Sequence, residues 1–114
     1  MRSSSVLLAL VCALVLLGSA RAAGSGVTAD PGVVTLGDTF TVTICGLTAG
    51  QGGYYEIENS TVAMVRSYGP VAASCVAFPE STASWAAGRY RIIAYVWSKR
   101  GTTRLGATSV EVDP

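Results

Sequence analysis

Apolar and polar residues alternate most regularly over two stretches of the chain. In residues 39–45, three apolar side chains alternate with threonines and a cysteine, a period of two that is typical of an antiparallel strand with one buried face. Residues 89–97 repeat the pattern over a longer run. The inward faces are predicted to carry Phe40, Val42 and Ile44 in the first strand and Tyr90, Ile92, Ala94 and Val96 in the second.

Shorter runs elsewhere predict further strands, separated by glycine and proline. Residues 27–36 form an opening strand that Pro31 and Gly32 interrupt, and no stretch shows helical periodicity for more than one turn. We therefore expect an all-β domain of about seven strands, arranged as a sandwich or a barrel. The remaining predicted strands are residues 54–58, 62–67, 74–78 and 108–112.

The N-terminus has the three-part order of a secretory signal. Arg2 precedes an apolar run over residues 6–17, and Ala20-Arg21-Ala22 gives a small-x-small cleavage pattern. The alternative is a membrane anchor, but an apolar run of twelve residues is shorter than the about 20 that a bilayer requires. We expect residues 1–22 to be a cleaved signal peptide and residues 23–114 to be one secreted, extracellular domain with no membrane contact after cleavage.

The charge of the domain limits its partners. The whole chain carries a net charge of +1, but Arg2 and Arg21 belong to the expected signal, which leaves six basic and seven acidic residues. A nearly neutral domain has no electrostatic footprint for nucleic acid or for an anionic membrane surface. We expect neither partner.

The expected mature domain contains two cysteines, Cys45 and Cys75. In an oxidising compartment such a pair indicates a disulfide, and closing a loop of about 30 residues would stabilise the fold by roughly 3–4 kcal/mol. The alternative is a metal site, but the chain has no histidine and would need further ligands. We expect no metal and no other cofactor.

Catalytic chemistry has little support in the sequence. Without histidine the chain lacks the usual general base, and both cysteines are expected to be paired. Glu56 and Glu58 share one strand face, which is the arrangement of a catalytic carboxylate pair, but two glutamates on an exposed strand are ordinarily solvated. We expect the domain not to be an enzyme.

The outward side of residues 89–97 is richer in large side chains than a solvated face requires. Ile93, Tyr95 and Trp97 alternate there, and residues 54–58 are expected on the same sheet face. Aromatic rings framed by charge can stack on sugars or anchor a protein interface. The alternatives are that loops cover this face or that charged side-chain stems shield its rings. The candidate binding face consists of Tyr54, Glu56, Arg91, Ile93, Tyr95 and Trp97.

Three basic residues, Lys99, Arg100 and Arg104, lie where a hairpin should join the last two strands. Loops at the end of a sandwich often touch ligands, so these side chains are candidate loop contacts. The alternative is a soluble turn that also protects an edge strand. The glycine-rich residues 50–53 are expected to form a flexible connection, and Trp85 is expected to close the open end of the sandwich.

Two short motifs resemble bacterial immunoglobulin-like or fibronectin-III-like domains. Residues 37–44, Gly-Asp-Thr-Phe-Thr-Val-Thr-Ile, are similar to the second strand of that fold, and residues 87–92, Ala-Gly-Arg-Tyr-Arg-Ile, are similar to the entry of its sixth strand. The resemblance implies a seven-stranded antiparallel β-sandwich over residues 23–114. It also implies a tyrosine-corner role for Tyr90, whose hydroxyl would bond to backbone upstream.

The cysteines depart from the antibody pattern, in which a disulfide links the second and sixth strands. The sixth strand here has Ala94, whereas Cys75 falls in strand E, which in this topology is the antiparallel neighbour of the second strand. The resemblance therefore implies an outward-facing cross-strand disulfide within one sheet. The register that faces Cys45 with Cys75 also pairs core residues, Ile44 with Val76 and Val42 with Phe78.

Three functions are compatible with these features. The leading hypothesis is a secreted, non-catalytic binding or adhesion domain that contacts a protein or a polysaccharide at the cell surface through the candidate binding face. The second is a structural envelope component that self-associates through an exposed edge. The third is a secreted inhibitor similar to the chagasin-like inhibitors of cysteine proteases, with residues 47–53 and 96–101 as its loops, although the Asn-Pro-Thr-Thr-Gly and Arg-Pro-aromatic motifs of that family are absent.

Overall fold

The computed structural model describes residues 26–114, and the expected signal peptide, residues 1–22, lies outside them. The described part of the chain is all-β and contains no helix. Its eight strands are β1 (Gly26–Asp30), β2 (Val33–Thr35), β3 (Thr39–Cys45), β4 (Gly53–Glu58), β5 (Ala63–Tyr68), β6 (Cys75–Ser81), β7 (Gly88–Ser98) and β8 (Gly101–Asp113).

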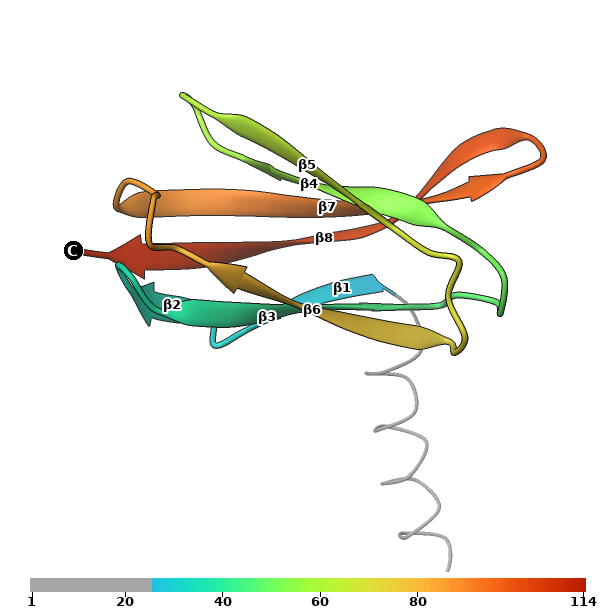
Figure 1. Cartoon of the computed structure of the whole chain (residues 1–114). Coiled ribbons are helices and arrows are strands. Elements are labelled where there is room, and N and C mark those ends of the chain that lie inside the picture. The colour runs from blue at the N-terminus through green and yellow to red at the C-terminus, as the bar shows by residue number, and fades with distance from the viewer. Residues whose placement is uncertain (1–25) are drawn as a thin grey trace, which may run out of the picture.

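The strands form two sheets (Figure 1). The smaller has the order β1-β3-β6, and the larger has the order β2-β8-β7-β4-β5. All neighbouring strands are antiparallel except β2 and β8, which are parallel. The all-β prediction is therefore confirmed, and the larger sheet has β7 at its centre and β5 and β2 at its edges.

The opening strand divides between the two sheets, as the break at Pro31 and Gly32 predicts. Before the break β1 pairs with β3, and after it β2 pairs with β8. Proline lacks a backbone N–H and cannot continue a ladder, so the chain changes partners there. Residues 26–35 thus join the two sheets, and the predicted single strand becomes two.

Two strands extend further than the sequence pattern indicates. The predicted strand over residues 108–112 is only the end of β8, which begins at Gly101 and pairs with β7 along nearly its whole length. The weakly alternating first half of β8 is held by its hairpin partner and not by a buried face of its own. β6 likewise continues beyond Phe78 through Pro79, which an edge strand tolerates because one side of its backbone has no partner.

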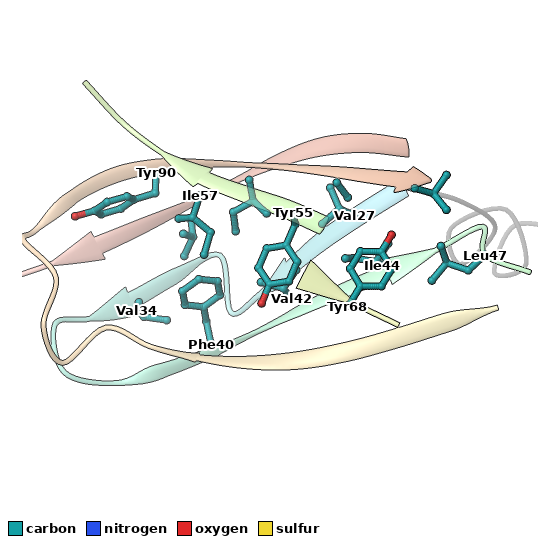
Figure 2. Close-up of a cluster of buried hydrophobic side chains, with 14 of the residues drawn as sticks. Val27, Val34, Phe40, Val42, Ile44, Leu47, Tyr55, Ile57, Tyr68 and Tyr90 are labelled. Atoms are coloured by element: carbon teal, nitrogen blue, oxygen red, sulfur yellow. The ribbon is translucent and has the colours of Figure 1, made fainter. Parts of the chain in front are cut away.

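The hydrophobic core lies between the sheets, and the inward residues predicted for β3 and β7 are all buried (Figure 2). Trp85 packs against one end of it, with its ring centroid 5.6 Å from that of Phe40 and 4.8 Å from that of Tyr90. The Tyr90 hydroxyl donates a hydrogen bond to the Ala86 carbonyl at 2.7 Å, which is the kind of backbone contact that the resemblance implies for this residue. Leu47 lies at the opposite end of the cluster.

The disulfide between Cys45 and Cys75 is present and confirms the predicted pairing. It joins β3 to β6 within the smaller sheet, because the two cysteines are directly opposite one another in the antiparallel register. Ile44 faces Val76 and Val42 faces Phe78 in the same register, as predicted. The alternation with buried Ile44 places Cys45 on the outer side of the sheet, although its side chain is largely covered.

Candidate binding surface on the five-stranded sheet

All six residues of the candidate binding face lie on β7, the central strand of the larger sheet, and on its neighbour β4. In the register between β4 and β7, Tyr54 is opposite Tyr95, Glu56 is opposite Ile93, and Glu58 is opposite Arg91. Side chains that are directly opposite on one face of an antiparallel pair lie within contact distance. The structure therefore brings the predicted residues of β4 and β7 together on one face.

Three aromatic residues form a cluster on this face, and we call Tyr54, Tyr95 and Trp97 the aromatic cluster. The rings of Tyr54 and Tyr95 are stacked, with centroids 4.8 Å apart and planes 21° apart. The ring of Trp97 lies 6.2 Å from that of Tyr54 and is tilted by 43°. Trp97 is 49% exposed, which makes it a large apolar surface open to solvent. A cluster held on paired strands is available for contact without prior rearrangement.

The backbone beneath the aromatic cluster is held by a tyrosine from β5. The Tyr68 hydroxyl donates a hydrogen bond to the Tyr95 carbonyl at 2.6 Å and passes close over Gly53. A Cβ at Gly53 would stand 2.1 Å from the Tyr95 carbonyl oxygen and 2.7 Å from the Tyr68 hydroxyl. Only glycine fits this position, so Gly53 fixes how closely β4 and β7 approach beneath the cluster.

The glycine-rich loop before β4 is anchored, in contrast to the flexible connection that the sequence predicts. Gly50 N–H donates to the Val71 carbonyl at 2.8 Å, and Val71 N–H donates back to the Gln51 carbonyl at 2.8 Å. Trp97 N–H donates to the Gly52 carbonyl at 2.9 Å. The loop composition indicated flexibility, but backbone partners from two distant segments hold it, and the loop thereby supports Trp97 from below.

Charged side chains flank the aromatic cluster. Partial desolvation, a hydrogen bond to Glu56 and the negative charge of Glu56 together raise the pKa of Tyr95, and the positive charge of Arg104 partly offsets them. Tyr95 and Arg104 face each other across the β7–β8 ladder. The cluster therefore combines apolar rings with one acidic and one basic neighbour.

The position of Arg104 differs from the sequence expectation. Lys99 and Arg100 lie at the turn between β7 and β8, as predicted, whereas Arg104 lies within β8 beside Tyr95. The reason is that β8 begins at Gly101, so the turn is shorter than the predicted one. Arg104 is consequently a neighbour of the aromatic cluster and not a loop contact.

The structure also corrects the expectation that Ile93 is an exposed part of the candidate binding face. It lies on the outer side of β7, as its alternation predicts, but it is only 6% exposed. Ile93 lies on the central strand, and longer side chains surround it, among them Arg91 and Tyr95 along β7 and Glu56 across the ladder. Their stems and rings cover a residue in that position. Ile93 supports the surface from beneath and contributes almost no area to it.

Two open hollows adjoin the sheet at opposite ends of β7. One, of about 680 Å³, lies beside Trp97 and is lined by residues 49–52 and 97–99. The other, of about 940 Å³, lies at the start of β7 and is lined by residues 58–61, 86–91 and 107–109. The first is continuous with the aromatic cluster through Trp97, so an extended partner could contact both.

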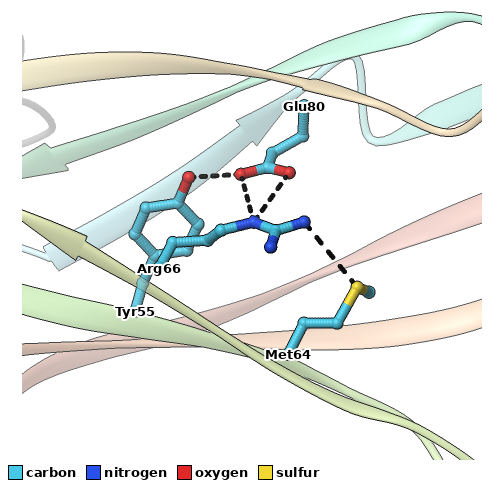
Figure 3. Close-up of polar contacts among 4 residues, drawn as sticks. All are labelled: Tyr55, Met64, Arg66 and Glu80. Atoms are coloured by element: carbon cyan, nitrogen blue, oxygen red, sulfur yellow. Dashed lines mark hydrogen bonds and ion pairs between the residues drawn. The ribbon is translucent and has the colours of Figure 1, made fainter.

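A polar contact inside the fold was not predicted from the sequence (Figure 3). Glu80 on β6 is only 6% exposed, accepts a hydrogen bond from the Tyr55 hydroxyl and forms an ion pair with Arg66, whose Nε lies 3.4 Å from each carboxylate oxygen. Desolvation by burial, followed by the bond to Glu80 and its charge, raises the pKa of Tyr55. The contact connects the two sheets, because Tyr55 and Arg66 belong to the larger sheet and Glu80 to the smaller.

A signal for this contact exists in the sequence. Val76, Phe78 and Glu80 fall on one side of β6, so extending the alternation past Pro79 places a glutamate on the inward face. A carboxylate in that position requires hydrogen-bonding or charged partners. The prediction missed it because the strand was ended at Phe78.

Within residues 26–114, no group of three or more histidine, cysteine, aspartate or glutamate side chains is placed to hold a metal ion. None of the elements in that range is a helix long and apolar enough to span a bilayer.

Comparisons of the chain with protein-family models, with curated proteins and with solved structures found no match.

Proposed function

We propose that the chain is a secreted, non-catalytic binding domain that contacts an extracellular partner through the aromatic cluster. The observation that carries this proposal is the exposure of Trp97, 49%, beside the stacked Tyr54 and Tyr95 on the paired strands β4 and β7. Large exposed aromatic side chains on a rigid support are the usual anchors of interfaces. A disulfide between Cys45 and Cys75 is compatible with an oxidising, extracellular location.

The proposed fold type is an immunoglobulin-like β-sandwich. Three features support it: an opening strand shared by both sheets, a disulfide partner strand β6 next to β3, and the Tyr90 hydroxyl bonded to backbone upstream. In such domains sheet faces and end loops serve as binding surfaces on a stable core. The fold is therefore consistent with a binding role and does not indicate catalysis.

A protein partner is favoured over a polysaccharide by the ring geometry. Stacking on a sugar uses the open face of an aromatic ring, but Tyr54 and Tyr95 already cover one face each by stacking on each other. Trp97 packs over Gly52. A Cβ added to Gly52 would lie 3.4 Å from two carbons of the Trp97 indole ring. The cluster thus presents ring edges, hydroxyls and one indole face, flanked by Glu56 and Arg104, which suits a mixed apolar and polar protein surface.

The proposal is tested by probing arrays of extracellular proteins and of glycans with the secreted protein and with its Trp97→Ala and Tyr95→Ala variants. We expect a protein ligand whose binding weakens by at least about 2 kcal/mol in Trp97→Ala, the range of an interface hot spot. Val33→Ala, which shortens another exposed apolar residue far from the cluster, is the matched control and should bind normally. Thermal stability should be nearly unchanged in Trp97→Ala because the side chain is half exposed.

The outcomes separate the hypotheses. Binding to glycans alone, lost in Trp97→Ala, would keep the surface and replace the partner class. A ligand whose binding survives both aromatic substitutions but is lost on changing Lys99 or Gly52 would move the site to the loops, as an inhibitor requires. No ligand on either array would contradict the proposed function.

A further inference from the structure

β5 forms a free edge of the larger sheet. It pairs with β4 on one side only and ends the strand order, so its other side carries backbone N–H and C=O groups with no strand beside them in the described part of the chain. Such groups can pair with another strand. β5 is six residues long, which is long enough for a ladder of several hydrogen bonds.

The other sheet edges of the described chain are protected, and β5 is not. β2 is only three residues long and follows Pro31, β6 contains Pro79, and β1 packs closely against β8, where an added Cβ on Gly106 would stand 3.1 Å from Gly26 Cα. Short edges, prolines and covered edges are the usual devices against edge-to-edge pairing. β5 contains no proline and no glycine, and no charge lies on its outward face.

The outward face of β5 carries small, uncharged side chains with a valine at its centre. Ala63, Val65 and Ser67 lie on the same face as Glu58, Glu56 and Tyr54 of β4, and Val65 is 58% exposed, more than any other large apolar residue of the described chain. Isolated exposed valines are common, but this one is the central outward residue of an unpaired strand. The edge therefore offers both backbone hydrogen bonds and apolar area to a partner strand.

The sequence of β5 is complementary to itself in an antiparallel register. When the pairing is centred on Val65, each valine faces its copy, Ala63 faces Ser67 of the second copy, and Met64 faces Arg66. A register centred on Arg66 would instead bring two like charges together, which is unfavourable. Arg66 and Met64 side chains are already compatible neighbours, since Arg66 Nη2 lies 3.8 Å from Met64 Sδ within one strand.

We propose that β5 is the interface between two copies of this chain, paired antiparallel about Val65. The two five-stranded sheets then form one continuous sheet with a two-fold axis perpendicular to it. That axis keeps both aromatic clusters on the same side of the joined sheet. A dimer of this kind presents two binding surfaces in parallel, which raises the avidity for a repetitive partner without any new contact to it.

The first experiment measures the oligomeric state of the secreted protein by sedimentation equilibrium from micromolar to millimolar concentration. We expect a reversible monomer–dimer equilibrium, because one pair of strands buries less area than a permanent interface does. Val65→Lys places a charge at the centre of the edge and should weaken dimerisation by at least about ten-fold. Val33→Lys introduces the same charge at the opposite edge and should leave the dissociation constant unchanged.

A second experiment tests the register. Facing residues in an antiparallel pair have Cβ atoms about 4.5–5.5 Å apart, so a Val65→Cys variant should oxidise to a dimer linked through residue 65 of each copy. Ala63→Cys is the matched control, because residue 63 faces residue 67 of the other copy. Peptide mapping by mass spectrometry identifies the linkage whatever other cysteines are present.

Three outcomes would overturn the proposal: a monomer at every concentration, a dimer that Val33→Lys abolishes and Val65→Lys does not, or equal cross-linking at residues 63 and 65. A monomer that captures a strand of a different protein through β5 would likewise replace the second copy as the occupant. Ligand binding that depends on Trp97 but persists in Val65→Lys separates this proposal from the proposed function.

Discussion

Gly53 lies at the point where three structural requirements meet. The Tyr95 carbonyl, the Tyr68 hydroxyl and the backbone of β4 approach so closely there that no side chain fits. Directly beneath the aromatic cluster there is consequently no space for a side chain at residue 53. Any residue other than glycine must push β4 from β7 or displace Tyr68, and both changes disturb the backbone beneath the aromatic cluster.

Gly53→Ala should therefore destabilise the domain strongly. The methyl group would overlap a backbone carbonyl, and we expect a loss of about 1–3 kcal/mol or more in the free energy of unfolding, as for other overpacked positions. Chemical denaturation monitored by circular dichroism measures this loss. Gly32→Ala is the matched control, because an added Cβ there meets nothing within 4 Å, and its effect should be below about 1 kcal/mol.

Tyr55 makes the folding stability of the protein depend on pH in the alkaline range. Its folded-state pKa is raised above the ordinary value of 10.0, so the folded state binds the phenolic proton more tightly than the unfolded state does. The resulting stability is fully present below about pH 10 and is lost as the pH rises further, at up to about 1.4 kcal/mol per pH unit. The raised pKa of Tyr68, caused by burial, acts in the same direction.

The Tyr55→Phe variant separates these contributions. At neutral pH it should be less stable than the native protein, because Glu80 loses a hydrogen bond in a buried position. Above pH 10 its unfolding free energy should fall less steeply than that of the native protein. Denaturant titrations at a series of alkaline pH values test this, and two parallel curves would show that Tyr55 does not control the dependence.

At the residue scale, the sequence predicted the sheet face on which a side chain lies better than it predicted how exposed that side chain is. The inward residues of β3 and β7 follow from a period of two, and all are buried. Ile93 shows the limit, because alternation gives the face on which a side chain lies and not the height of its neighbours. Glu80 shows a second limit, since its burial depends on partners from β4 and β5 that are distant in the sequence.

At the element scale the disulfide connects two strands that already pair. Cys45 and Cys75 lie opposite one another in the β3–β6 ladder, so the covalent bond and the hydrogen bonds hold the same edge strand in register. The bond acts chiefly by limiting the freedom of the unfolded chain. Between the two cysteines lie β4 and β5, and the disulfide therefore closes a loop that contains two residues of the candidate binding face, Tyr54 and Glu56.

Replacing both cysteines by alanine should lower the free energy of unfolding by about 3–4 kcal/mol, the value expected for a loop with a sequence separation of 30. Urea denaturation of the variant, compared with the native protein before and after reduction, measures the loss. Reduced native protein and the double variant should agree closely. A variant as stable as the oxidised protein would show that the bond contributes nothing to folding stability.

The boundaries of a strand were predicted accurately where its own side chains alternate between apolar and polar. They were predicted poorly where the strand is held mainly by hydrogen bonds to its neighbour. β3 was predicted to the residue because its alternation is complete from Thr39 to Cys45. β8 was predicted for less than half its length, because residues 101–107 pair with β7 while showing little alternation. That shortfall also displaced Arg104 from its true place beside Tyr95. A boundary error in one strand thus became an error in the composition of the candidate site.

At the scale of the whole molecule, the two tryptophans report on different regions. Trp85 packs on the core beside Phe40 and Tyr90, whereas Trp97, at the far end of β7, is half exposed. We expect acrylamide to quench the fluorescence of Trp97 strongly and that of Trp85 weakly. Trp97→Phe and Trp85→Phe each leave one emitter and assign the two signals.

This arrangement allows binding and unfolding to be observed separately. Partner binding at the aromatic cluster should shield the emission that remains in Trp85→Phe and leave the emission of Trp97→Phe unchanged. Unfolding should make the two variants equally quenchable. If binding altered the Trp85 signal alone, the contact surface would lie at the other end of β7.

The parallel pairing of β2 with β8 has a mechanical consequence. The ladder is flanked by two further backbone bonds, from Leu36 N–H to the Asp113 carbonyl at 2.7 Å and from Glu111 N–H to the Gly32 carbonyl at 2.9 Å. Tension applied to the chain before β2 and after β8 would pull these parallel strands past each other lengthwise. Their hydrogen bonds would then bear the load together and break as a group, whereas the antiparallel β7–β8 hairpin, opened from its ends, would separate one bond at a time.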